Sequence, residues 1–324
     1  MNAALYITDY GALLPTGNHP GALLAAVLAG QTCTRMEDTL MVPASRGAAM
    51  PVTARLPAPL PGLLDLTLRL LASWQDAPVL LVLPDPAQRQ HHSLFTTLKP
   101  AVHAHCHLTT PRQLPDALAW QAQRLHTGEH TCLTVLAVDD LLTRDCLLAL
   151  NQSGALRTDQ HPLGRAPAQG LAWFQLTAAK SDTDTNIAWR GLHANEEPNH
   201  NQIGSAPLHG LAHCLKQCLE DESTPARPEV VVHARAQTQA EQLEWYHARQ
   251  QVWPDDRQQP AMELLCPALT HGDLGAASLA AAVVLACERL RFALKPATDA
   301  LVIDTTEQGG RLALTLSRSA TRSP

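Results

Sequence analysis

Hydrophobic residues along the chain follow two patterns that alternate with one another. Short continuous apolar runs, typical of strands buried on both faces, lie at residues 79–83, 133–138 and 171–176. Between them, apolar residues recur every three or four positions, as in helices that pack on one face. These segments predict helices at residues 20–28, 63–74, 114–125 and 141–150, and a glycine follows three of them as a C-terminal cap.

A polar stretch at residues 180–206 interrupts this alternation and contains little apolar periodicity apart from residues 187–192. The alternation then returns, with helices expected at residues 208–219, 240–248 and 274–286, and strands at 229–233, 300–303 and 312–316; one more strand is expected at 4–7. Alternating helices and buried strands predict an α/β fold with mostly parallel sheets. We expect two duplicated α/β halves, 1–179 and 207–324, joined by a polar linker at 180–206.

Composition narrows the classes of function. Hydrophobic residues make up 45% of the 324 residues but aromatic ones only 4%, so the core is built largely from Leu and Ala. The net charge of -6 and the lack of a long basic run argue against nucleic acid as a partner. The most apolar segment, 276–286, is too short to span a bilayer. Without a basic leader or any paired CxxC motif among eight cysteines, we expect a cytoplasmic protein with reduced thiols.

Several short motifs occur in the order found in β-ketoacyl synthases. They are the opening 7–17 with a following helix that ends in Leu-Ala-Gly, a helix end and strand at 125–139, a strand at 167–172, two histidine motifs at 230–244 and 270–277, and a Gly-Gly turn at 308–310. The chain therefore resembles a shortened β-ketoacyl synthase of the thiolase superfamily over nearly its whole length. The resemblance implies a thiolase-like fold, with the two halves packed as a layered α/β/α/β/α core.

The positions that carry chemistry in this family are altered. A condensing enzyme needs a cysteine thiolate at a helix start and two histidines that stabilise charge on the thioester oxygens. Counting back from Gly128 puts the nucleophile position at Pro111, with no Cys or Ser beside it. His233 stands at the first histidine position but lacks the Gly-Thr-Gly-Thr that usually follows, and His271 precedes Gly272 instead of following it. We expect all four positions to be vestigial and no residue to be catalytic.

A second candidate site surrounds Cys106. His103, His105 and His107 would share one face of a strand and could bind a metal ion. Transition-metal sites usually combine ligands from separate elements, so we expect a polar strand edge, with no metal and no cofactor. Cys106 itself lies too far upstream of the helix start to replace the missing nucleophile.

We expect a non-catalytic assembly partner. Segments 36–50 and 60–86 resemble the ketosynthase-like proteins encoded beside type VI secretion spike genes, which implies an accessory in effector loading with spike, adaptor or effector proteins as partners.

Two alternatives stay open. One is a partner of an active ketosynthase and an acyl carrier protein, similar to a chain-length factor, although the short chain favours the secretion role. The other is a residual acyl-thioester enzyme that uses His233 and water. A homodimer is compatible with each of the three.

Overall fold

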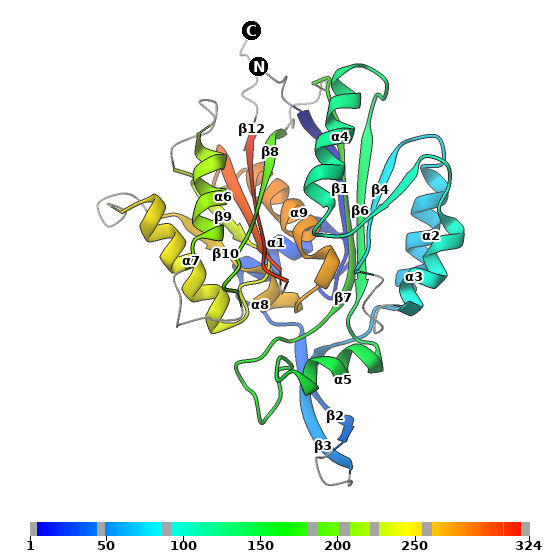
Figure 1. The fold of residues 1–324 in the computed structure, drawn as a ribbon, viewed down its shortest axis with the longest axis vertical. Coiled ribbons are helices and arrows are strands. Elements are labelled where there is room, and N and C mark those ends of the chain that lie inside the picture. Colours follow the sequence, from blue (N-terminus) through cyan, green and yellow to red (C-terminus); the bar gives the residue numbers. More distant parts are fainter. Residues whose placement is uncertain are drawn as a thin grey trace.

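The computed structural model describes residues 5–43, 49–85, 92–180, 187–200, 208–220, 227–254, 261–306 and 308–318. Within these ranges the main feature is a ten-stranded sheet in the order β10-β9-β11-β12-β8-β1-β7-β6-β4-β5 (Figure 1). The strands of the first half are β1 (Leu5–Leu13), β4 (Val79–Val82), β5 (Cys106–Thr109), β6 (Leu133–Asp140) and β7 (Gln169–Thr177). Those of the second are β8 (Ile187–Glu196), β9 (Val230–His233), β10 (Glu263–Leu265), β11 (Asp299–Thr305) and β12 (Gly310–Arg318).

The two halves repeat one topology. Read outward from the centre, the first half runs β1-β7-β6-β4-β5 and the second β8-β12-β11-β9-β10. In each, the first two pairings are antiparallel and the last two parallel. The halves meet where β1 pairs antiparallel with β8, with Ile7 opposite Ile187. This repetition confirms the duplicated α/β architecture.

The expectation of mostly parallel sheets is wrong, because β1–β8 and both inner pairings of each half are antiparallel. The continuous apolar runs reflect burial on both faces and not the direction of pairing. β11, for example, is buried along its whole length although it pairs antiparallel with β12 on one side. Helices cover both faces of each half, so antiparallel strands here carry the apolar pattern usual in parallel sheets.

Five layers follow from where the helices pack. The central core holds side chains of α1 (Pro20–Leu28), α4 (Leu114–His126) and α9 (Ser278–Arg291) together with strands of both halves. Helices α2 (Leu63–Ser73) and α3 (His92–Leu98) cover the outer face of the first half. Helices α6 (Gly210–Leu219) and α7 (Gln239–Val252) cover that of the second (Figure 1). The α/β/α/β/α layering expected from the sequence is therefore confirmed.

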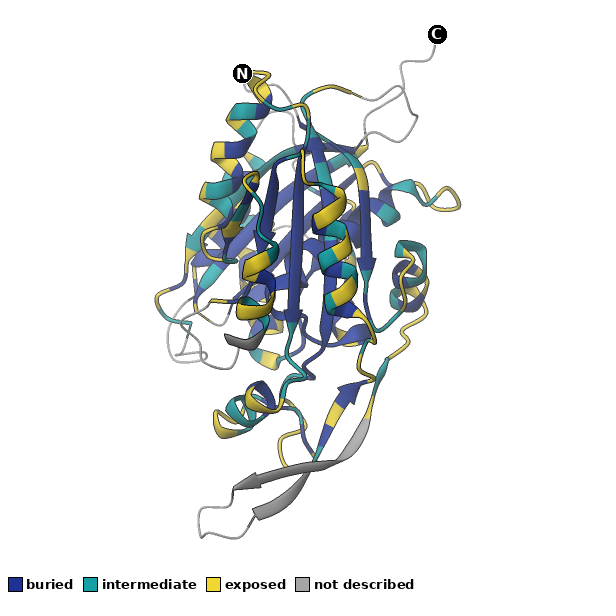
Figure 2. Ribbon diagram, turned by 90° about the vertical axis from the view of Figure 1, so that its right-hand side faces the viewer, coloured by how far each residue is buried: buried dark blue, intermediate teal, exposed yellow. Residues whose placement is uncertain are grey.

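Helix α9 lies at the centre of the molecule, and all but two of its fourteen residues are buried. Its run of Ala and Val, residues 280–287 with one Leu and one Cys, lets strands approach closely from both sides. A 3-10 turn, Gly275–Ala277, precedes it, so the helix predicted at 274–286 starts and ends a few residues later than expected. Each fully buried Val or Leu here stabilises the fold by about 1.5–3 kcal/mol. Figure 2 shows buried strands at the centre of the molecule and exposed residues on the helices around them.

The segment predicted as a polar linker contains a strand of the central sheet. Residues 187–196 form β8, between β1 and β12, and only residues 181–186 and 201–206 of that segment lie outside the described residues. Its first three residues, Ile187, Ala188 and Trp189, are buried, and the remainder is mostly half-exposed. Because the remaining residues of β8 are mostly polar, the sequence shows no strand pattern there. The division of the chain at this point stays a prediction.

A two-stranded hairpin, β2 (Thr34–Pro43) and β3 (Ala49–Pro57), projects from the body of the molecule (Figure 1). It contains the segment 36–50 used for the secretion resemblance, of which residues 44–48 lie outside the described part, as does Pro86 of segment 60–86. Its base is bound to the loop after α5 (Arg144–Gln152), where Arg55 N–H donates to the Arg157 carbonyl and Asp159 N–H to that of Thr53. None of the described helices is long and apolar enough to cross a membrane.

Candidate functional site

A cavity of about 720 Å³ opens where the two halves meet, at the ends of β4, β5 and β6 and beside the turns that precede α4 and α9. Its lining combines apolar side chains with charged side chains from both halves. The apolar residues include Leu83, Phe95, Leu108, Leu141 and Leu150, and the charged residues include Asp85, Arg112, Asp116, Asp139, Arg165, Arg235 and Asp273.

Pro111 lies at this cavity, just before the first turn of α4. This start of a helix offers few hydrogen-bond donors, because Pro111 and Pro115 have no backbone N–H. The N–H groups of Gln113 and Leu114 both donate to the Thr110 carbonyl, at 3.0 and 2.9 Å. A helix start normally favours a bound anion through its unpaired N–H groups. Here that capacity is reduced, and no thiol occupies the position.

Arg235 and Asp273 face one another on the cavity floor. The Arg235 guanidinium donates from Nε to Asp304 Oδ1 at 2.9 Å and from Nη2 to the Gly275 carbonyl at 2.5 Å, and its Nη1 lies 3.8 Å from Asp273 Oδ1. Neither residue is predicted from the sequence. A signal exists, however: Asp273 follows Gly272, where the family pattern has its second histidine, and Arg235 stands between two alanines directly after a buried strand.

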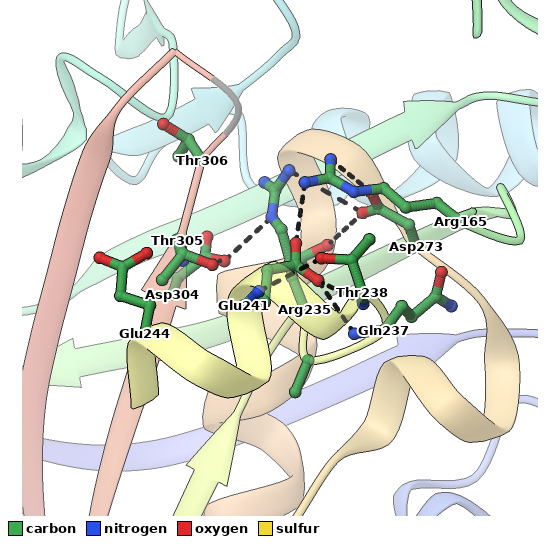
Figure 3. Close-up of polar contacts among 12 residues, drawn as sticks. Arg165, Arg235, Gln237, Thr238, Glu241, Glu244, Asp273, Asp304, Thr305 and Thr306 are labelled. Atoms are coloured by element: carbon green, nitrogen blue, oxygen red, sulfur yellow. Dashed lines mark hydrogen bonds and ion pairs between the residues drawn. The ribbon is translucent and has the colours of Figure 1, made fainter. Parts of the chain in front are cut away.

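Arg165 extends this pair into a network that crosses between the halves (Figure 3). It precedes β7 in the first half and reaches two carboxylates of the second, Glu241 Oε1 at 2.8 Å and Asp273 Oδ2 at 3.5 Å. We define the floor network as Arg165, Arg235, Glu241, Asp273 and Asp304, and every member is buried or nearly so. It contains three carboxylates and two guanidinium groups.

The pKa values of the three carboxyl groups in the network shift in different directions. Burial favours the neutral form of Asp273, but the neighbouring Arg235 and Arg165 outweigh it and hold the pKa of Asp273 below its usual value. Burial raises the pKa of Asp304, and Arg235 offsets this only in part. Burial likewise raises the pKa of Glu241, despite Arg165. Two guanidinium groups therefore do not fully compensate three buried carboxyls.

The turn that carries Asp273 is fixed from the first half. Asp139, at the end of β6, accepts a hydrogen bond from Ala276 N–H at 2.8 Å. It approaches so closely that a Cβ on Gly275 would lie 2.0 Å from its Oδ2, and Gly275 also has a φ of +54°. Only glycine fits there. A close contact between the two halves thus fixes the backbone of this part of the cavity.

Of the four vestigial positions predicted from the sequence, only Pro111 lines the cavity. Val230 and Val232 of β9 pack in the central core and Val231 packs in the outer one, so alternation places His233 on the outer side with Val231. His233 is fully buried, near Arg311, and neither ring nitrogen has a hydrogen-bond partner among the described residues. Burial and Arg311 lower its pKa to about 3.

His271 and Gly272 also lie away from the lining. His271 is buried and its Nδ1–H donates to the Gly272 carbonyl at 2.7 Å, while burial lowers its pKa to about 4. Gly272 has a φ of +95°, and a Cβ there would meet the Ala166 carbonyl oxygen at 2.8 Å, so it serves a backbone role. Neither buried histidine is placed to contact a molecule in the cavity.

The histidines around Cys106 do not converge. The His103 and His105 rings are 6.4 Å apart, and His107 packs edge-on against Trp120. Within the described ranges, no group of three His, Cys, Asp or Glu residues could hold a metal ion. Burial raises the pKa of the Cys106 thiol to about 11. A different cysteine, Cys146 near the start of α5, lines the cavity, with its sulfur 3.8 Å from the Asp140 carbonyl.

No family model and no curated protein matches the chain. Solved structures do. The ishigamide ketosynthase/chain length factor superposes with a TM-score of 0.68 at 15% identity, over 98% of this chain and 100% of that chain. The AntDE:AntF complex, a type II PKS acyl-carrier protein with its ketosynthase, matches with a TM-score of 0.73 at 12% identity, over 99% and 100%. A β-ketoacyl synthase from Burkholderia phymatum matches with a TM-score of 0.70 at 13% identity, over 98% of this chain and 100% of that chain. These similarities show a ketosynthase-type, thiolase-like fold, as the sequence resemblance implies.

The floor network predicts a large penalty for removing one of its cations. Arg235→Met leaves Asp304 and Asp273 buried with an unbalanced charge, so we expect the free energy of unfolding to fall by about 3–5 kcal/mol. Arg112→Met is the matched control: Arg112 and its partner Glu196 are both exposed, so its loss costs less than about 1 kcal/mol. Urea unfolding measures both, and equal losses would contradict the role given to the network.

The two buried histidines predict loss of stability in acid. Their pKa values are lowered to about 3 and 4 in the folded state, so between there and about pH 6.5 the unfolded chain binds protons that the folded chain does not. Above about pH 6.5 these two histidines do not reduce the free energy of unfolding. Below it, the free energy of unfolding decreases by about 1.4 kcal/mol per pH unit for each histidine. His233→Leu should reduce this slope by about 1.4 kcal/mol per pH unit, the contribution of one histidine. Urea unfolding at a series of pH values measures the slope, and a slope equal to that of the parent protein would refute the assignment.

Proposed function

We propose that this protein does not condense acyl thioesters and acts as a ketosynthase-like assembly partner. One observation carries the proposal. At the cavity between the halves, Pro111 stands at the start of α4, and the floor carries Arg235 and Asp273 in place of a thiol and two histidines.

Each of these residues is unsuited to condensation. Proline has no side-chain nucleophile, so no acyl-enzyme can form at position 111. The Arg235 guanidinium stays protonated and cannot accept a proton. The pKa of Asp273 is held low by Arg235 and Arg165, so its carboxylate would repel the oxyanion that develops on a thioester. The hypothesis of a residual enzyme that uses His233 gains no support, because that ring is buried on the other side of β9.

For the partner, we propose the type VI secretion apparatus, in which the protein would assist effector loading onto the spike. The support is the resemblance of segments 36–50 and 60–86, and the hairpin β2–β3 that contains most of the first segment projects from the body, where a partner can reach it (Figure 1).

A chain-length-factor-like role is the second candidate, favoured by a specific observation. The ishigamide ketosynthase/chain length factor chain is matched over its full length, so the shortness of this chain does not argue against that role. Its partners would be an active ketosynthase and an acyl carrier protein.

Affinity purification of the tagged protein, expressed at its native level and analysed by mass spectrometry, separates the two roles. We expect spike, adaptor or effector proteins to co-purify. Recovery of a ketosynthase or an acyl carrier protein instead would replace the secretion role with the second candidate. A tagged preparation that captures neither group, compared with an unrelated tagged protein, would contradict the assembly role.

A further inference from the structure

We propose that Arg165 is a positioning residue for the hairpin β2–β3. Its ion pairs within the floor network hold residues 155–168, the connecting loop between α5 and β7, and this loop sets the orientation of the hairpin on the body. The proposal deepens the proposed function, because it rests on the hairpin as the surface that a partner reaches. It assigns the orientation of that surface to the floor network.

The hairpin forms a sheet of its own, and its base is hydrogen-bonded to the connecting loop. The Arg55 N–H of β3 donates to the Arg157 carbonyl at 3.1 Å, and the Asp159 N–H donates to the Thr53 carbonyl at 3.0 Å. Ala54, between the two bonded residues of β3, is completely buried. The connecting loop thus continues the hairpin at its base as a further extended segment.

The connecting loop folds back on itself, which brings Arg165 beside the residues that hold the hairpin. The Arg157 N–H donates to the Arg165 carbonyl and the Arg165 N–H donates to the Ala155 carbonyl, both at 2.7 Å. The two arms of the loop are so close that a Cβ on Gly164 would lie 2.6 Å from the Leu156 carbonyl oxygen. Arg157 is therefore bonded in both directions, through its carbonyl to the hairpin and through its N–H to Arg165.

The other end of the connecting loop is anchored in the second half of the molecule. The Arg165 guanidinium lies 2.8 Å from a Glu241 oxygen and 3.5 Å from an Asp273 oxygen (Figure 3). The next residues are held by backbone bonds, from the Asp273 N–H to the Ala166 carbonyl at 2.7 Å and from the Ala168 N–H to the Asp273 carbonyl at 2.8 Å. Because the Arg165 side chain is only 13% exposed, its loss would leave nearby buried carboxylates less well compensated.

Apolar contacts also attach the base of the hairpin, and they involve the same loop. Ala54 and Leu56 of β3 form a small cluster with Leu147 of α5 and Leu156 of the connecting loop. Leu150 packs against this cluster and also lines the cavity. Apolar attraction has no preferred direction, whereas hydrogen bonds and ion pairs do. The cluster therefore attaches the hairpin, and the polar link through Arg157 and Arg165 sets its orientation.

Hydrogen–deuterium exchange, measured by mass spectrometry of peptides from the whole protein, tests the proposal. In Arg165→Met we expect the amides of residues 53–57 and 155–160 to exchange about tenfold faster than in the parent protein, because the local opening that exposes them costs less free energy. A cooperative thermal transition verifies that the variant folds.

Arg235→Met is the matched control. It removes the other guanidinium group of the floor network, whose hydrogen bonds to Asp304 and Gly275 stay within the second half. This variant should lower the stability of the whole protein, while the amides of residues 53–57 and 155–160 exchange as in the parent. A residue that only stabilises the fold would give the same exchange pattern as Arg235→Met.

A second variant tests the ion pair itself. Glu241→Gln removes the charge opposite Arg165 but keeps an oxygen that can accept the hydrogen bonds from the Gln237 and Thr238 N–H groups. It should accelerate exchange of the same amides, and the double variant Arg165→Met/Glu241→Gln should exchange more slowly than the product of the two accelerations.

Three results would overturn the proposal. They are parent-like exchange of the hairpin base in Arg165→Met, equal acceleration there in Arg165→Met and Arg235→Met, and independent effects in the double variant. Each is measured on the protein alone and does not depend on which proteins co-purify, so this proposal and the proposed function can fail separately.

Discussion

The Arg235 guanidinium, held between Asp304 and Asp273 and linked through Asp273 to Arg165, is the interaction on which the centre of the molecule depends. Buried charges cost several kcal/mol each unless they are paired, so the network persists only while all of its members are present. Its members come from both halves, and it therefore fixes the turn before α9 against the loop before β7. Two of these side chains, Arg235 and Asp273, line the cavity and also support the proposal that the protein does not condense acyl thioesters. The stability of the centre and the proposed lack of condensation therefore involve the same residues.

How far the sequence predicts this structure depends on how much of each element is buried. The helix at 20–28 agrees with α1 at both ends, because Pro20 begins it and the chain leaves it at Gly30 with a positive φ. Strand β8 was not predicted, because only its first three residues are buried and the rest carry polar side chains. Strands β5 (Cys-His-Leu-Thr) and β10 (Glu-Leu-Leu) were not predicted either, because they are short and polar residues interrupt any apolar run.

The site shows a second limit. Pro111 could be placed from the sequence, because a position in a helix can be counted back from the glycine that ends it. His233 could not, because successive side chains of a strand point to opposite faces and the sequence does not reveal which face borders the cavity. The residues that do line the floor, Arg235 and Asp273, lie two residues after one predicted histidine and two after the other. Small offsets of this kind decide whether a residue reaches a cavity or a core.

The direct measurement of the central claim is the intact mass of the protein after incubation with a short acyl thioester, such as octanoyl-N-acetylcysteamine, beside an active ketosynthase as a positive control. The account predicts that the mass of this protein stays unchanged while the control gains one acyl group. A stoichiometric acyl adduct would contradict it. If peptide mapping then placed the adduct on Cys146, the thiol that lines the cavity, the protein would be an enzyme with a relocated nucleophile.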